Sequence, residues 1–269
     1  MTHASPERPL SPEEAQLLRL ADDEYVLAER YTEWQIYAPT PESDLALANV
    51  AQDEFGHARL WYDVLQDEFG YEEADLLWER PPDAFLHSPL VELATPEGDW
   101  ADTVVRGYLY DAAERLRLDA LAASSYDPIA DRVRKVQGEE EYHREHAQSW
   151  LDRLSASADA HSRVQDAIDR LFPYALTLFA PTRFEDAIVD EGVRTRPPSE
   201  LRADWLDEVV PYLESLDFVV PEPDAVQRPD AVGRDGTHTA DWDALYEEFT
   251  ATYHELGFDR PATLRSENA

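Results

Sequence analysis

The chain has 269 residues, of which 58 are acidic and 23 basic, so its formal net charge at pH 7 is −35. This charge excludes a nucleic-acid-binding protein, because phosphates require a cationic surface. No apolar run is long enough to span a membrane, and a chain without cysteine has no disulfide, no thiolate metal site and no iron–sulfur cluster.

The acidic residues are spread along the whole chain, and Lys135 is its only lysine. Because 43% of the residues are hydrophobic, the chain can build a core and is not a disordered acidic tail. This composition is typical of a halophile, in which molar salt screens the repulsion between carboxylates. The N-terminal segment MTHASPERPLSPEE has no apolar region of a signal peptide, so we expect a soluble, cytoplasmic, halophilic protein.

The first half of the chain has helical periodicity interrupted by proline and glycine. The segment Ser11-Pro12-Glu13-Glu14 predicts an N-cap with proline at the first helical position, and the helix that follows runs to about Tyr37. A second helix is predicted from about Ser43 to Gly70. Residues 71–99 are rich in proline and are expected to form mostly loop.

The second half of the chain continues the helical pattern. Long helices are predicted over about 100–124, 129–154 and 160–179. Shorter helices are predicted over 182–189 and 200–216, irregular structure over 219–239, and an amphipathic helix over 241–257. Because no segment has the alternation typical of a strand, we predict an all-α protein built as a helical bundle.

Two Glu-x-x-His pairs indicate a metal site. Glu54 and His57 lie on the second predicted helix, and Glu140 and His143 lie on the fourth. A separation of three residues places a carboxylate and an imidazole on one face of a helix, where both can bind one ion. In carboxylate-bridged four-helix bundles two helices each supply such a pair, and the other two helices each supply one carboxylate.

The first and third long helices offer the remaining carboxylates. Glu24 is the candidate on the first helix, and Glu114 is the candidate on the third, with Asp111 on the same face as its alternative. The predicted ligand set is Glu24, Glu54, His57, Glu114, Glu140 and His143. Oxygen and nitrogen ligands of this kind suit a pair of iron ions, with manganese as second choice, rather than calcium or zinc. The alternative is that these acids belong to a solvated surface.

The other histidines have no carboxylate at ligand spacing. His87, His161 and His238 are therefore interpreted as surface or core residues. The chain also lacks a glycine-rich phosphate loop and a Gly-x-Ser-x-Gly motif, so neither nucleotide binding nor α/β-hydrolase chemistry is indicated.

Four segments give the chain a family resemblance: SDLALANVAQDEFGHAR, EGDWADTVVRGYLYDA, EEEYHREHAQSWLDRL and GRDGTHTADWDALYEEF. Their order and spacing resemble the PaaC family over about residues 15–257. Members of this family are ferritin-like subunits of the multicomponent ring-1,2-phenylacetyl-CoA epoxidase of aerobic phenylacetate degradation. The resemblance implies one domain over 1–269, with a ferritin-like four-helix bundle in 11–180 and a helical extension in 181–269.

The resemblance also implies partners. The related PaaA subunit holds the catalytic di-iron site, and the flavin and iron–sulfur reductase PaaE delivers electrons from NADPH, so the reductase would be an indirect partner. PaaC subunits support PaaA without iron where their ligand positions carry apolar or amide residues, whereas this chain keeps acids and histidines there. Three hypotheses remain open: an epoxidase subunit with its own di-iron centre, a free-standing ferritin-like di-iron oxidase or iron-binding protein, and a scaffold without metal.

Overall fold

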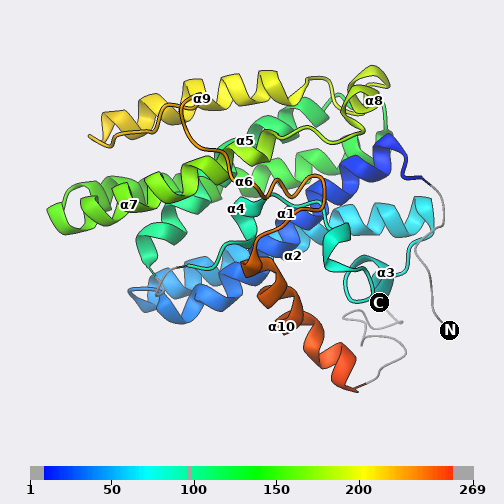
Figure 1. The fold of residues 1–269 in the computed structure, drawn as a ribbon, viewed down its shortest axis with the longest axis horizontal. Coiled ribbons are helices and arrows are strands. Elements are labelled where there is room, and N and C mark those ends of the chain that lie inside the picture. The colour runs from blue at the N-terminus through cyan, green and yellow to red at the C-terminus, as the bar shows by residue number, and fades with distance from the viewer. Residues whose placement is uncertain (1–8, 96–98, 257–269) are drawn as a thin grey trace.

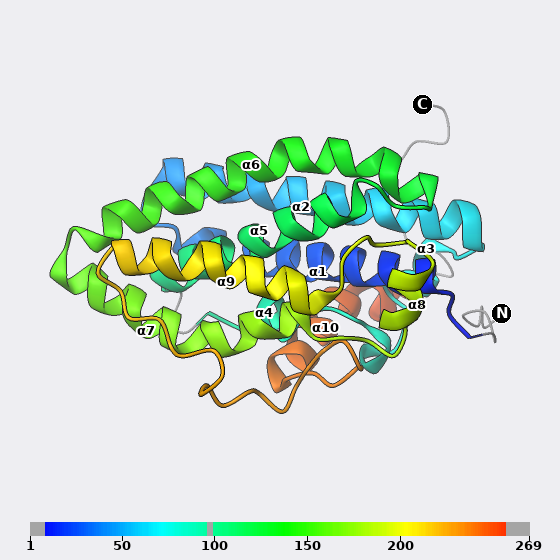
Figure 2. The same ribbon diagram turned by 90° about the horizontal axis from the view of Figure 1, so that it is seen from above.

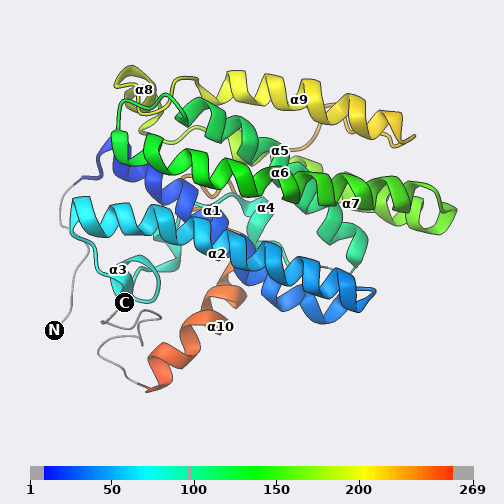
Figure 3. The same cartoon turned by 180° about the vertical axis from the view of Figure 1, so that it is seen from behind.

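The computed structural model describes residues 9–95 and 99–256, in which every regular element is a helix. Four long helices form a bundle: α1 (Pro12–Trp34), α2 (Pro41–Phe69), α5 (Trp100–Leu121) and α6 (Asp127–Ser155). α1 and α2 run antiparallel, as do α5 and α6, and α2 and α6 lie side by side on one face (Figure 1, Figure 3). The predicted all-α class and ferritin-like bundle are confirmed.

The helix ends follow from local sequence. Ser11 and Glu14 form a capping box at the start of α1, with Pro12 as the first helical residue. α1 ends at Trp34, and one 3₁₀ turn then continues to Tyr37, where the sequence predicted the end of the helix. α2 begins at Pro41, two residues earlier than predicted, because the Thr40 side chain caps it; Gly70, with φ of 78°, ends it.

The segment between the two helix pairs is mostly loop, as predicted, with two short helices: α3 (Glu73–Leu76) and α4 (Pro89–Glu92). The C-terminal half adds α7 (Ala158–Ala175), α8 (Glu185–Asp190), α9 (Pro198–Ser215) and α10 (Ala240–Leu256). α7 and α9 pack on α5 (Figure 2), and α10 projects from the bundle beside α4 (Figure 1). Among the described helices, none combines the length and the hydropathy that a membrane span requires.

The apolar interior of the bundle is divided into two clusters along its axis. On α1, residues 17, 18, 20 and 21 belong to one cluster, and Val26, Leu27, Tyr31 and Trp34 belong to the other. On α2, Ala51 and Ala58 are divided in the same way. The turns that separate the two clusters carry fully buried glutamates, Glu24 on α1 and Glu54 on α2. Buried carboxylates are costly unless something compensates their charge, so this level of the bundle is where a functional site is expected.

Candidate metal centre

Six buried side chains from the four bundle helices meet between the two apolar clusters: Glu24, Glu54, His57, Asp111, Glu140 and His143. They form two overlapping groups. In each group, one ligand atom of every member lies within 4.8 Å of the others. The first group takes Glu24 from α1, Glu54 and His57 from α2, and Glu140 from α6; the second takes Glu54, Asp111 from α5, and His143 from α6.

The two glutamates of the Glu-x-x-His pairs lie between the histidines. His57 Nδ1 is 3.2 Å from Glu140 Oε1. His143 Nδ1 is 3.7 Å from the same oxygen and 3.4 Å from Glu54 Oε1. Glu54 therefore belongs to both groups, and Glu140 faces both imidazoles. This is the placement of carboxylates that bridge two metal ions.

The outward nitrogen of each histidine is held by a carboxylate of the opposite helix. His57 Nε2 lies 2.7 Å from Glu139 Oε2, and His143 Nε2 lies 3.3 Å from Asp53 Oδ2. An N–H on Nε2 that donates to a carboxylate leaves the Nδ1 lone pair directed into the centre, which is how metal-binding histidines are commonly oriented. Glu139 precedes Glu140 and Asp53 precedes Glu54, so α2 and α6 orient each other's ligand.

The inward atoms of the centre have no hydrogen-bond partner within the described part of the chain. They comprise both carboxylate oxygens of three glutamates, one aspartate oxygen and two imidazole nitrogens, contributed by Glu24, Glu54, Glu140, Asp111, His57 and His143. Buried polar atoms are nearly always paired, so nine orphaned atoms at one place require an explanation. Convergent lone pairs with nothing to donate to them are the donor set of a cation site.

The electrostatics of the centre are those of crowded acids. Burial, together with neighbouring carboxylates, raises the pKa of Glu24 and Asp111 well above the ordinary values. Burial also raises the pKa of Glu54. Burial on its own would lower the pKa of His57, but the carboxylates of Glu140 and Glu24 outweigh it and raise the pKa to about 12. Without a metal ion, protons must neutralise this centre.

The residues fit a pair of divalent ions. Glu24, Glu54, Asp111 and Glu140 carry four negative charges when ionised, which two divalent ions balance. Two ligand atoms bound at about 2.1 Å and at a right angle lie about 3.0 Å apart, close to the 3.2–3.7 Å found between the imidazole nitrogens and the carboxylate oxygens. Mixed oxygen and imidazole ligands in a four-helix bundle suit iron or manganese.

Five of the six ligands predicted from the sequence lie in these groups, and Glu114 does not. Glu114 is fully buried but forms an ion pair with Arg117, one turn further along α5, and Arg117 also binds Asp23. Of the two acids that the sequence left open on this helix, the structure brings Asp111 into the centre. The Glu114–Arg117 pair lies three residues apart and was visible in the sequence, but the burial of Arg117 was not.

Sequence reasoning missed Asp53 and Glu139, the acids that hold the outward histidine nitrogens. A signal was present. In both Glu-x-x-His pairs an acid directly precedes the glutamate, as Asp53-Glu54 and as Glu139-Glu140. The repeated pattern acid-Glu-x-x-His is more specific than the pair alone.

Two cavities reach the centre. One of about 30 Å³ touches Asp111 and His143 and is lined by Tyr31, Val104 and Gly107 among others. The other, of about 290 Å³, reaches Glu140 from the surface. Its walls are polar and charged: Arg115, Asp119, Gln137, Glu141 and Arg144 surround a single leucine, Leu118.

Comparison with known proteins gives the same picture as the centre. The family model described as "Phenylacetic acid catabolic protein" matches residues 1–256. The chain is 33% identical over 227 residues to the PaaC subunit of the 1,2-phenylacetyl-CoA epoxidase of Escherichia coli (strain K12), covering 84% of this chain and 89% of that protein. It is 29% identical over 198 residues to the PaaA subunit of the epoxidase of the same organism, covering 71% of this chain and 62% of that protein. The chain therefore belongs to the phenylacetic acid catabolic protein family.

Proposed function

We propose that this chain is the PaaC-like subunit of a multicomponent phenylacetyl-CoA epoxidase, and that it pairs with and supports a catalytic PaaA-like subunit. Similarity over most of the chain to the PaaC subunit, and weaker similarity to the PaaA subunit, support this assignment. The observation that carries the proposal furthest is the centre itself, because its orphaned ligand atoms distinguish the chain from a plain helical scaffold. We further propose that the subunit holds its own di-iron centre.

The space around the centre supports a supporting rather than a substrate-oxidising role. A cavity that accommodates benzene has a volume of about 150 Å³. The cavity beside Asp111 and His143 has about 30 Å³, enough for one or two water molecules or a diatomic gas. The larger cavity at Glu140 is lined by charged side chains, which do not suit an aromatic ring. A phenylacetyl group has no apolar place next to the ions in this subunit.

The residues of the centre have separate tasks in this proposal. Glu54 and Glu140 would bridge the two ions, with Glu24 and His57 completing one site and Asp111 and His143 the other. Two ferrous ions bound in this way would supply oxygen-reducing chemistry. Glu139 and Asp53 hold the imidazoles in the binding tautomer.

Iron content tests the centre. The purified subunit, loaded with Fe(II) without oxygen and then desalted in molar salt, is expected to retain about two ions per chain. Glu54→Ala/His57→Ala removes ligands of both groups and is expected to retain at most a small fraction. Glu141→Ala/His146→Ala is the matched control, because it removes the same residue types from α6 outside both groups. Absence of iron in the folded wild-type subunit would leave the scaffold without metal.

Co-purification tests the partner. A PaaA-like chain expressed with this subunit is expected to elute with it as a hetero-oligomer in molar salt, and the complex is expected to be needed for epoxidation of phenylacetyl-CoA. A subunit that forms only homo-oligomers and oxidises Fe(II) alone would instead support the free-standing di-iron oxidase. The result does not depend on the iron content, so partner and metal are tested separately.

A further inference from the structure

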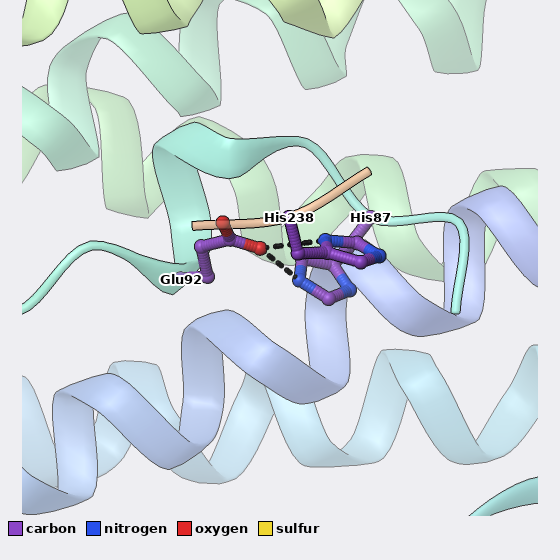
Figure 4. A group of neighbouring side chains, drawn as sticks. All are labelled: His87, Glu92 and His238. Atoms are coloured by element: carbon purple, nitrogen blue, oxygen red, sulfur yellow. Dashed lines mark hydrogen bonds and ion pairs between the residues drawn. The ribbon is translucent and has the colours of Figure 1, made fainter. Parts of the chain in front are cut away.

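A second group of ligand-type side chains lies outside the four bundle helices (Figure 4). His87 precedes α4, Glu92 is the last residue of α4, and His238 lies in the loop before α10. Both imidazoles turn toward the same carboxylate oxygen. His87 Nε2 is 2.6 Å and His238 Nδ1 is 2.7 Å from Glu92 Oε2. The side chains of His87 and Glu92 are fully buried, and that of His238 is 5% exposed.

The contacts of His238 require a cation. Its Nε2 lies 3.0 Å from the carbonyl oxygen of Phe85, which can only accept a hydrogen bond. Its Nδ1 faces Glu92 Oε2, which also accepts when the carboxylate is ionised. A neutral imidazole has one N–H and satisfies only one of these acceptors. When Nε2–H donates to the carbonyl, the Nδ1 lone pair faces the carboxylate, and a proton or a metal ion must lie between them.

The surroundings orient the ligand atoms as they are oriented in metal sites. The Nε2–H of His238 donates to a backbone carbonyl, which is a common outer contact of a metal-binding histidine. The second oxygen of Glu92 accepts a hydrogen bond of 2.6 Å from the Thr239 N–H, so that Oε2 remains directed at the histidines. The two imidazoles are stacked, with centroids 4.2 Å apart and planes 22° apart, which brings both ligand nitrogens to one side.

We propose that His87 Nε2, His238 Nδ1 and Glu92 Oε2 form a separate mononuclear site for a divalent transition-metal ion such as Zn²⁺. Two imidazoles and one carboxylate are typical ligands of Zn²⁺ and of non-haem Fe²⁺. In a tetrahedral zinc site with bonds of about 2.0–2.1 Å, such ligand atoms lie about 3.3 Å apart. Each nitrogen–oxygen contact therefore opens by about half an ångström when the ion enters, which small side-chain rotations provide.

The ion would act as a clasp between distant parts of the chain. His87 and Glu92 belong to the segment that packs on α1, whereas His238 leads into α10. Arg30 of α1 already joins the same two parts, because it donates to the carbonyl oxygens of Glu92 and Asp241. A metal ion at this point closes the loop between the bundle and α10.

The test uses a variant in which the bundle centre is disabled, Glu54→Gln/His57→Gln/His143→Gln. Equilibrium dialysis of this variant against Zn²⁺ in molar salt is expected to give about one ion per chain. The added change His238→Asn is expected to abolish that binding. The added change His161→Asn is the matched control and is expected to retain it, because His161 also stacks on a ring, that of Phe218, but belongs to none of the ligand groups found in the described residues.

Two further measurements keep the result independent of folding defects. Zn²⁺ is expected to raise the thermal midpoint of the bundle-centre variant and to leave that of its His238→Asn derivative unchanged. X-ray absorption at the zinc edge is expected to show two imidazole ligands. A folded bundle-centre variant that retains no zinc, or that retains the same zinc with and without His238→Asn, would overturn the proposal.

Discussion

Glu139 and Asp53 are partly exposed acids, yet they decide how the buried histidines present their lone pairs. The side chains of Glu139 and Asp53 are 43% and 39% exposed, so their carboxylates stay hydrated while they accept from His57 and His143. Without these acceptors the imidazoles can turn or change tautomer, and the inward Nδ1 is no longer a reliable ligand. Two rim residues on opposite helices therefore control the geometry of the centre.

Replacement of one rim acid is expected to weaken metal binding without unfolding the protein. Glu139→Gln keeps the size of the side chain but removes the charge that stabilises the His57 N–H, so the affinity for Fe(II) or Mn(II) is expected to fall about 10- to 100-fold. Competition with a chelator of known affinity measures the change. Glu141→Gln, on the same helix but outside the centre, is the control, and equal affinities for the two variants would contradict the role assigned to Glu139.

The metal-free protein is expected to lose stability as the pH rises. The pKa values of Glu24, Glu54, Asp111 and His57 are all raised by folding, so the folded protein holds these protons at higher pH than the unfolded chain. Stability from a raised pKa is complete below the unfolded value and is lost as the pH rises through the folded value. From about pH 7 to pH 9, His57 keeps one extra proton in the folded state, which lowers the free energy of unfolding by about 1.4 kcal/mol per pH unit.

Urea unfolding of the chelator-treated subunit in molar salt, at several pH values, measures this slope. His57→Gln removes the titrating imidazole and is expected to flatten the dependence over the same range. Loading with metal is expected to have a similar effect, since ions then replace the protons in the centre. A metal-free protein whose stability increases from pH 7 to pH 9 would contradict the raised pKa of His57.

The loop before α10 depends on glycine. Gly233 has φ of +74°, and a Cβ atom placed there would lie 1.9 Å from the carbonyl oxygen of His87. The Gly233 N–H also donates to the Thr237 carbonyl oxygen, which shapes the turn that leads to His238. The close approach of this loop to the segment before α4 is therefore possible only without a side chain at position 233.

Gly233→Ala is expected to destabilise the protein by about 2 kcal/mol or more, because it combines a left-handed backbone with a backbone clash. Gly138→Ala is the control of opposite sign. Gly138 lies inside α6 with nothing within 4 Å of an added Cβ, so alanine there is expected to stabilise the helix by about 0.5–1 kcal/mol. Denaturant midpoints of the two variants measure both effects, and equal shifts would show that the contact at Gly233 is unimportant.

The charge of −35 affects the protein as a whole. Many acids are paired inside: Arg80, Arg117 and Arg234 bind Asp22 and Asp23 beneath the surface. With only 23 basic residues available, most of the 58 acids remain without a cationic partner and repel one another. At low ionic strength this repulsion opposes the compact state.

The thermal midpoint is expected to rise when potassium chloride is increased from about 0.1 M to about 1 M, since the screening length falls from about 10 Å to about 3 Å. Calorimetry or circular dichroism of the metal-loaded subunit measures the rise, with metal kept saturating. The greater part of the gain is expected below about 1 M if screening is the cause. A gain confined to higher concentrations would indicate exclusion of salt from the apolar surface instead.

The sequence was sufficient for the features that depend on local order. Capping residues, prolines and helical periodicity located the four bundle helices to within a few residues, because each helix end is determined by its immediate neighbours. The Glu-x-x-His spacing likewise identified four of the residues in the bundle centre, since positions three apart share one face of a helix.

Only the tertiary structure decided which distant residues meet. It brought Asp111 rather than Glu114 into the bundle centre, because Arg117 is buried beside Glu114 and neutralises it. It also brought His87 and His238, interpreted from sequence as surface or core residues, to the same oxygen of Glu92 across about 150 positions of chain. The physical reason is that long-range contacts depend on how helices and loops pack, and spacing along the chain carries no information about a partner on another element.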